Sequence, residues 1–171
     1  MENTDGKQDV ENRNIQSALV SVGKSIVQWT QNEYRFATTI PGLTFFRHDE
    51  PSEIRTGMYE PSISLVAQGA KRVMLGDNTF VYDASHYLIT SVHLPTFVQI
   101  IIEASREKPY LGLMLKLDLR EISQLMVDSN LPPSRSQQSS RGMATGEVTI
   151  QLTNAFVRLI DLLADEKDIP T

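Results

Sequence analysis

Few side chains of this sequence have the types and the spacing that catalysis requires. It has no cysteine nucleophile, no Gly-x-Ser-x-Gly turn, no Gly-rich phosphate loop and no His-Glu-x-x-His pair. The candidate metal ligands are the three histidines, His48, His86 and His93. Metal-dependent barrel enzymes bring several ligands to within about 2.2 Å of one ion, with two close histidines on one strand. Because His86 and His93 stand on either side of an expected strand and no His-x-His pair occurs, we expect no metal and no cofactor.

Carboxylates are the other candidates for chemistry, and their neighbours favour a structural role. Glu103 and Glu107 are close in sequence, but Glu107 lies in a turn beside Arg106 and Lys108, which is typical of solvated ion pairs. The charged run 47–51 has two interpretations, ion pairing at a strand end or the polar mouth of a pocket. Neither requires catalysis, so we expect that the protein is not an enzyme.

The elements that must position these side chains are short strands between residues 59 and 117. Apolar runs rich in Val, Ile, Phe, Tyr and Thr recur there, and turn residues close each one. The clearest unit runs from Lys71 to Tyr82, where Gly76-Asp77-Asn78 can form a tight hairpin turn. This punctuation predicts a sandwich or barrel. The expected strands are 43–46, 63–68, the two arms of 71–82, 87–91, 97–103 and 110–117.

Helices are expected on both sides of this strand region. Apolar residues at intervals of three and four predict a helix over 13–31, after a flexible tail at 1–12. Asp118 with Glu121 forms a capping-box pattern for a helix that ends near Asp128. A flexible loop is expected over 129–146, and a closing helix follows from Val148. We therefore divide the chain into a tail (1–12), a helix plus barrel (13–117) and a helical subdomain (118–171).

Composition and charge exclude several classes of protein. The 171 residues carry a net charge of −5 and a pI of about 5.2, without a dense Lys/Arg cluster, so this chain alone is not expected to bind DNA. With no cysteine, a disulfide framework is excluded. The N-terminus lacks the pattern of a signal peptide, and no apolar run approaches the ~20 residues that cross a bilayer. We expect a soluble, cytoplasmic protein with no membrane partner.

Several runs of the sequence, taken in order, resemble a known family. They are Tyr59-Glu60-Pro61-Ser62, 68–73, Leu75-Gly76-Asp77, 87–91 with Leu94-Pro95, Glu103-Ala104-Ser105, Pro109-Tyr110-Leu111, and 159–163 followed by Asp168-Ile169-Pro170. In this combination the chain resembles, over roughly 40–171, the N-terminal domain of AraC-type transcriptional regulators. The resemblance implies a cupin-like β-barrel that senses a small molecule, followed by helices that pair protomers. Family members continue into two helix-turn-helix motifs, which are absent from this chain, so DNA binding would belong to the whole regulator.

We therefore expect a mainly β fold with helices (α+β), a cupin-like β-barrel or double-stranded β-helix followed by a helical subdomain. The expected function is that of the effector-sensing and dimerising half of a bacterial transcription regulator. The alternatives are a cupin-fold enzyme, such as a sugar isomerase or dioxygenase, and a dimerisation scaffold whose barrel holds no ligand.

Two sets of residues follow as candidates. The predicted ligand contacts mix polar tips with aromatic bodies on barrel strands, although the alternation does not fix which face is the inner one: Tyr59, Ser64, Gln68, Tyr87, Ser91, His93, Gln99 and Met114. The largely aliphatic strand faces favour a small apolar or aromatic effector over a sugar. The closing helix carries a stripe that we expect to form a homodimer: Leu152, Phe156, Leu159 and Leu163. The competing interpretation packs its extra apolar residues against the 119–128 helix of the same chain.

Overall fold

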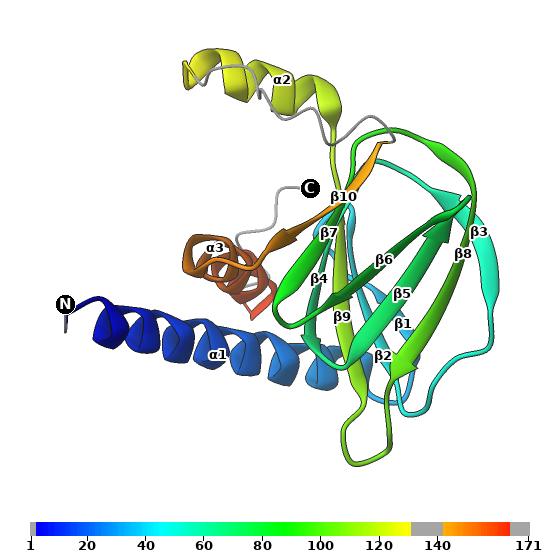
Figure 1. The fold of residues 1–171 in the computed structure, drawn as a ribbon, viewed down its shortest axis with the longest axis horizontal. Coiled ribbons are helices and arrows are strands. Elements are labelled where there is room, and N and C mark those ends of the chain that lie inside the picture. Colours follow the sequence, from blue (N-terminus) through cyan, green and yellow to red (C-terminus); the bar gives the residue numbers. More distant parts are fainter. Residues whose placement is uncertain (1–2, 131–141, 165–171) are drawn as a thin grey trace.

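The strands form one curled antiparallel sheet with two helices packed on its outer face (Figure 1). The computed structural model describes residues 3–130 and 142–164. The strands in those residues are β1 (Arg35–Ala37), β2 (Leu43–His48), β3 (Arg55–Tyr59), β4 (Ser62–Gln68), β5 (Ala70–Leu75), β6 (Asn78–Asp83), β7 (His86–Thr90), β8 (Leu94–Glu103), β9 (Tyr110–Lys116) and β10 (Met143–Glu147). The helices are α1 (Asn3–Thr30), α2 (Leu119–Asp128) and α3 (Ile150–Asp161), which continues into the 3₁₀ turn η2 (Leu162–Ala164).

The sheet curls until its two edges approach each other. The strand order is β1-β2-β9-β4-β7-β6-β5-β8-β3, with β10 paired to β7. Arg55 on the β3 edge places its guanidinium 5.7 Å from the ring centroid of Tyr34, which directly precedes β1. This half-barrel with helices confirms the fold class predicted from the sequence.

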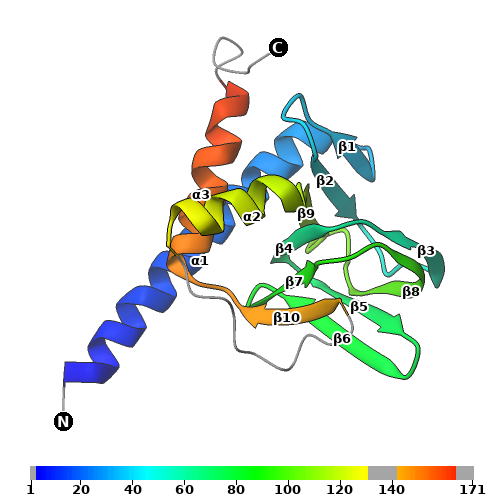
Figure 2. The ribbon, with the colours of Figure 1, turned by 90° about the horizontal axis from the view of Figure 1, so that it is seen from above.

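Period-two alternation along the strands separates two cores, one on each face of the sheet. The outer core joins sheet residues to α1 and α3, and its buried members include Leu19, Val22, Ile26, Leu43, Phe45, Leu65, Leu111, Phe156 and Ile160. The inner core lies inside the curl and contains Tyr59, Val66, Val73, Tyr82, Leu88, Ile101, Tyr110 and Met143. Figure 2 shows α1 and α3 side by side on the outer side of the sheet.

Local signals in the sequence are confirmed where a side chain or a turn conformation decides the structure. Strands β5 and β6 pair from Ala70↔Asp83 to Leu75↔Asn78, and Gly76 in the turn has a φ of +57°. Asp118 caps α2, and its Oδ1 accepts the N–H groups of Arg120 (2.9 Å) and Glu121 (3.3 Å). Thr149 caps α3 in the same way, accepting from the N–H of Leu152 at 3.2 Å.

Two expected boundaries are wrong. The first helix begins at Asn3 and not at residue 13, so the described part of the predicted tail is helical. Residues 6–14 are exposed and bury nothing; the helix extends there because propagation from the packed turns adds one hydrogen bond per residue.

The second correction concerns the predicted loop over 129–146. Its residues 143–146 belong to β10, which pairs with β7 and places Gly146 opposite Tyr87. Gly and Ala give this segment little intrinsic strand preference, and the ring of Tyr87 packs over Gly146 in compensation. Residues 131–141 lie outside the described part of the chain. Over the residues that the structure does describe, no helix is both long and apolar enough to cross a membrane.

Candidate ligand-binding site

The inner face of the half-barrel forms a cavity of about 480 Å³ that is partly open to solvent. Strands from both halves of the curl supply its walls. Its lining includes Tyr34, Phe46, Arg55, Gly57, Tyr59, Glu60, Ser64, Lys71, Tyr82, Gln99, Tyr110, Met114 and Lys116. Polar groups therefore converge on a space whose floor is the inner apolar core, which is the usual composition of a small-molecule pocket.

Three buried tyrosines form a hydrogen-bonded cluster in this cavity. Tyr82 shares side-chain hydrogen bonds with Tyr59, Tyr110 and Ser64. The Tyr59 hydroxyl also donates to Oε1 of Gln99 across a long 3.5 Å. Burial raises the pKa of Tyr59 to about 12 and raises the pKa of Tyr82 and Tyr110 as well. All three hydroxyls are therefore protonated near neutral pH and can donate hydrogen bonds.

Two cationic side chains in the cavity have no carboxylate partner among the described residues. Lys71 projects from the inner face of β5, and its Nζ lies 6.0 Å from the ring centroid of Phe46 on β2. Among the described residues the ion pairs are Arg47–Asp49, His86–Asp83 and Lys116–Glu60, and none of them includes Lys71 or Arg55. Burial, reinforced by the charge of Arg55, lowers the pKa of Lys71 to about 8.

His48 lies between the rings of Tyr34 and Tyr110, with a centroid separation of 6.1 Å to each. It lines a smaller chamber of about 70 Å³ together with Ser52, Arg55, Lys71 and Gln99. The chamber and the main cavity share Tyr34, Phe46, Arg55, Lys71 and Gln99. Burial, followed by the charges of Arg55 and Lys71, lowers the pKa of His48 to about 4, so its ring is neutral near pH 7.

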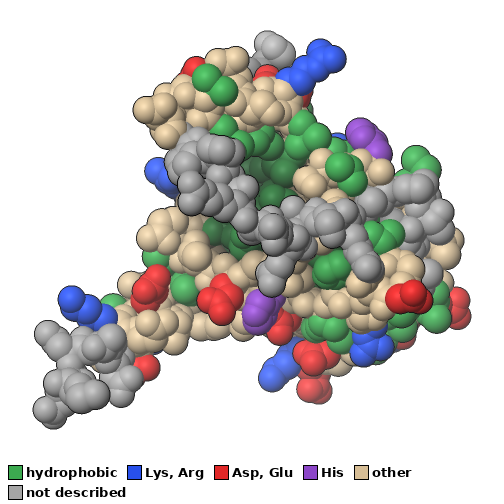
Figure 3. All heavy atoms as spheres, turned by 45° about the horizontal axis from the view of Figure 1, so that its top comes forward, with side chains coloured by type: hydrophobic (Ala, Val, Ile, Leu, Met, Phe, Trp, Pro, Cys, Tyr) green, Lys and Arg blue, Asp and Glu red, His purple; other side chains and the backbone are tan. Residues whose placement is uncertain are grey.

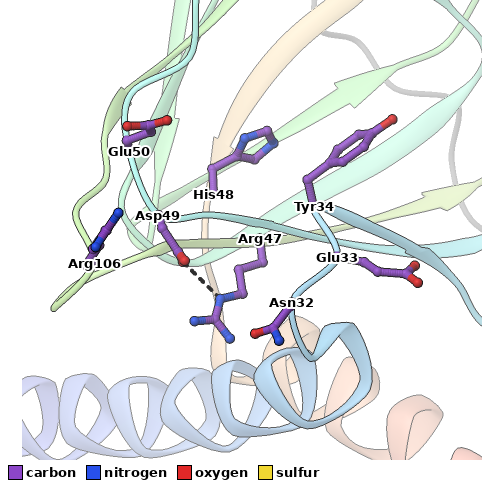
Figure 4. A pocket seen from close by; sticks show the side chains of 8 residues that line it. All are labelled: Asn32, Glu33, Tyr34, Arg47, His48, Asp49, Glu50 and Arg106. Atoms are coloured by element: carbon purple, nitrogen blue, oxygen red, sulfur yellow. Dashed lines mark hydrogen bonds and ion pairs between the residues drawn. The ribbon is translucent and has the colours of Figure 1, made fainter.

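The charged run that leaves β2 lines a separate polar pocket of about 310 Å³ (Figure 4). Nε of Arg47 donates to Oδ1 of Asp49 at 3.0 Å, and Nη1 donates to the carbonyl of Gln31 at 2.8 Å. Figure 4 shows Arg47 pointing toward α1 and His48 pointing the opposite way, as alternation along a strand requires. Both interpretations of this run thus hold: it contains an ion pair, and it forms the polar wall of a pocket.

Four of the eight predicted ligand contacts, Tyr59, Ser64, Gln99 and Met114, line the main cavity. All four project from the inner face of the sheet, each from a different strand. The sequence pattern therefore identified part of the cavity lining. Their role in binding stays a prediction.

The other four predicted contacts lie elsewhere. Gln68 follows a register shift in β4, and its Nε2 donates to the carbonyl of Pro109 at 2.8 Å, beside a groove under α1. Tyr87 packs against the outer core, on the opposite face from Leu88. Ser91 and His93 follow the end of β7 and are exposed. A register shift moved Gln68, strand parity turned Tyr87 outward, and Ser91 and His93 lie beyond the end of their strand. Residue type alone predicts none of these placements.

Sequence reasoning missed Arg55, Lys71, Tyr82 and Tyr110. Lys71 had a usable signal, because it shares the parity of Val73 and Leu75 on one strand and opposes Tyr82 in the hairpin. A lysine on a strand is ordinarily exposed, so the pattern gave no reason to place its ammonium inside the barrel.

The predicted metal and dimer positions can also be located. His48 lies inside the barrel, His86 lies beside Asp83 and His93 is exposed; in the described ranges no three potential ligands form a cluster for a metal ion. Of the α3 stripe, Phe156 and Leu163 are buried within the chain, whereas Leu152 and Leu159 are half-buried. Helix α3 packs against α1, while the competing interpretation placed it against 119–128.

Comparison with known proteins gives one family and several solved structures. Residues 39–171 match the family described as AraC-type transcriptional regulator N-terminus. An apo variant of ToxT from Vibrio cholerae shares 6% identity over 74% of this chain and 49% of that chain, with a TM-score of 0.49. Wild-type ToxT bound to an unsaturated fatty acid shares 7% identity over 70% of this chain and 45% of that chain, with a TM-score of 0.46. The cupin domain of Drosophila melanogaster CENP-C shares 14% identity over 45% of this chain and 61% of that chain, with a TM-score of 0.31.

The chain spans about half the length of the ToxT chains that it matches. A comparison with curated proteins gave no match.

Proposed function

The chain belongs to the AraC-type transcriptional regulator N-terminus family, and on that premise we propose that its barrel cavity binds the small molecule that controls the regulator. The family identifies the chain as the regulatory domain of such a protein. The effector, the second protomer and the DNA-binding half of the whole regulator are parts of this proposal.

The observation that carries the proposal is the polar cavity inside the sheet. Protein interiors are ordinarily filled at close to crystal density, and buried polar groups are ordinarily paired. Here about 480 Å³ lies among tyrosine hydroxyls, an amide and two cations without carboxylate partners in the described chain. A small molecule that fills the space and pairs with the two cations accounts for both features.

The fold also offers a route from the cavity to the helices. Strands β2, β4 and β9 turn one face toward the cavity, with Phe46, Ser64 and Met114, and the other toward α1 and α3, with Phe45 and Leu65. A ligand that binds one curvature of the sheet better than another would shift the position of the helices by the difference in its affinity. In the whole regulator such a shift would change how two DNA-binding halves are presented.

The proposal assigns no catalysis and no cofactor to the chain. The matched family is one of regulatory domains.

Filling the cavity tests the proposed function. The test uses the whole regulator and a transcription reporter that is induced by a cell extract containing the effector. Met114→Trp should abolish this induction, because the indole occupies the volume proposed for the ligand. Met74→Trp is the matched control, since Met74 is half-buried on β5 with the opposite parity from Lys71 and Val73. A normal response from Met114→Trp, in protein that remains folded by circular dichroism, would contradict the proposal.

A further inference from the structure

We propose that the effector is a small monocarboxylate, with its carboxylate held in the small chamber by Lys71 and Arg55 and its apolar or aromatic body in the main cavity. This assignment rests on the proposed function and names the chemical class of its ligand.

Positive charges outnumber negative charges in the barrel cavity. Four cations line the main cavity, Arg35, Arg55, Lys71 and Lys116, against one carboxylate, Glu60. Glu60 pairs with Lys116 at the exposed mouth, so it does not neutralise Lys71 or Arg55. Arg35 and Arg55 are exposed, whereas Lys71 is half-buried and its ammonium is desolvated. The cost of an uncompensated charge therefore falls on Lys71, and a bound anion removes that cost.

Hydrogen-bond donors from several strands converge on the small chamber. Lys71 enters it from β5, and Arg55 and Gln99 enter from β3 and β8, where they are direct register partners. The guanidinium of Arg55 presents parallel N–H donors that match a carboxylate, and Lys71 adds a point charge. Ser52 Oγ accepts the N–H of Ile101 at 2.9 Å, which leaves its own proton to donate.

The volume of the small chamber fits a carboxylate. A volume of about 70 Å³ accommodates a group of a few atoms, such as a carboxylate, since one water takes about 30 Å³ of liquid volume. The rest of the ligand must extend into the main cavity, where Phe46 and Met114 offer apolar contacts.

Titration supports the same assignment. The lowered pKa of Lys71, about 8, shows that its ammonium is poorly solvated without a partner. An anion in the chamber favours the charged form, and so binding should raise this pKa. A neutral ligand would leave the ammonium unpaired, and a cationic ligand would be repelled by Arg55 and Lys71.

The test compares carboxylates with neutral molecules of the same shape. Thermal unfolding of the 171-residue chain would be followed with butyrate, octanoate, benzoate and phenylacetate, and with their primary amides. We expect at least one carboxylate to raise the melting temperature and no amide to do so. An aryl phosphate that stabilises the chain more than its carboxylate counterpart overturns the choice of head group, and the absence of any carboxylate shift overturns the proposal.

A substitution at Lys71 separates recognition from structure. Lys71→Met should raise the melting temperature of the ligand-free chain, because it removes a poorly solvated charge, and should weaken carboxylate binding by about tenfold or more. Lys108→Met, at an exposed loop position, should change neither quantity. If Lys71 only supports the barrel, Lys71→Met lowers the ligand-free melting temperature, and that outcome contradicts the proposal.

The two proposals fail in different ways. A reporter that loses its response with Met114→Trp while no carboxylate binds leaves the sensor function in place and removes the anion. A reporter insensitive to Met114→Trp removes the sensor function itself.

Discussion

At the scale of single residues, the parity of each strand decides whether a side chain serves the cavity or the outer core. Lys71 and Val73 project inward from β5, and Tyr82 meets Lys71 from the neighbouring strand. His48 projects inward from β2, whereas Arg47 next to it points toward α1 (Figure 4). The cavity therefore collects titratable groups whose ordinary surroundings would be water, and their pKa values shift in consequence.

His48 makes a pH dependence testable. Its pKa is about 4 in the folded chain and about 6.5 when unfolded, so the unfolded chain binds more protons between these values. Stability should therefore fall as the pH drops from about 6.5 to about 4, because protonated His48 meets the charges of Arg55 and Lys71, with only Asp49 opposing them. Urea unfolding across this range should show a smaller loss of unfolding free energy for His48→Gln than for the wild type.

The matched control is His86→Gln, since His86 is exposed at the start of β7. Carboxylates also titrate near pH 4, but they do so in both variants and cancel in the comparison. An identical pH dependence of the wild type and His48→Gln would show that His48 is not desolvated in the folded state.

Four of the eight residues predicted from the sequence line the cavity, and there is a physical reason for this share. Tyr59, Ser64, Gln99 and Met114 combine polar or polarisable groups with strand positions, and residue type was enough to select them. Gln68 and Tyr87 have the same chemistry but project to the other face. A strand pattern gives two faces without saying which is inside, and long-range pairing settles that choice.

At the scale of elements, α1 and the short strand β1 both precede the family match. The match begins at residue 39, yet Leu19, Val22 and Ile26 of α1 are buried against the sheet. Gly23 faces the sheet, but a Cβ there would make an ordinary contact, 3.4 Å from Cδ1 of Leu111, so the packing does not require glycine at this position. The amphipathic spacing predicted this packing, but nothing in it marked the start of the helix, because residues 6–14 have no tertiary partner.

We expect Ile26→Ala to lower the free energy of unfolding by about 2–5 kcal/mol, because Ile26 is fully buried in the outer core and its loss leaves a cavity. The neighbouring Val27 is 38% exposed, and Val27→Ala should change stability by no more than about 1 kcal/mol. Chemical denaturation of the two variants would measure the difference. Equal small effects would mean that α1 does not stay docked on the sheet in solution.

Strand β10 shows why other elements escaped prediction. Its sequence, Met-Ala-Thr-Gly-Glu, lacks an alternating pattern, and the pairing with β7 and the ring of Tyr87 stabilise it from outside. β3 contains Gly57 and forms the sheet edge, so its strand character also depends on its partner, β8. Elements with their own hydrophobic period were predictable, whereas those that depend on a neighbour were not.

At the scale of the whole molecule, the half-barrel places the cavity and the helices on opposite faces of the same strands. The turn punctuation of the sequence predicted a sandwich or barrel, and the resemblance carried by the order of short motifs narrowed this to a cupin-like barrel with helices. The same arrangement leaves the helical side open. Hydrophobic side chains gather in a hollow beside α2 (Figure 3), and no described residue of α2 is buried.

The last prediction is that this helical side forms the homodimer. Leu152 and Leu159 of α3 are half-buried, and Leu125 of α2 is 62% exposed, so apolar area remains there after α1 has covered Phe156 and its neighbours. A second copy related by a two-fold axis presents the same apolar surface and can cover it. Sedimentation velocity at tens of micromolar should therefore show a dimer for the wild type.

Single charges should dissociate that dimer without unfolding the chain. Leu159→Glu and Leu125→Glu each place a carboxylate in the proposed contact, and each should give a folded monomer. Leu163→Glu is unsuitable, because Leu163 is only 3% exposed and a charge there would disrupt the outer core. Val10→Glu, at a position that is 55% exposed within the exposed stretch 6–14 of α1, should remain dimeric as the control. A wild-type chain that sediments as a monomer would rule out dimerisation through this side, because the interface tested here belongs to the chain itself.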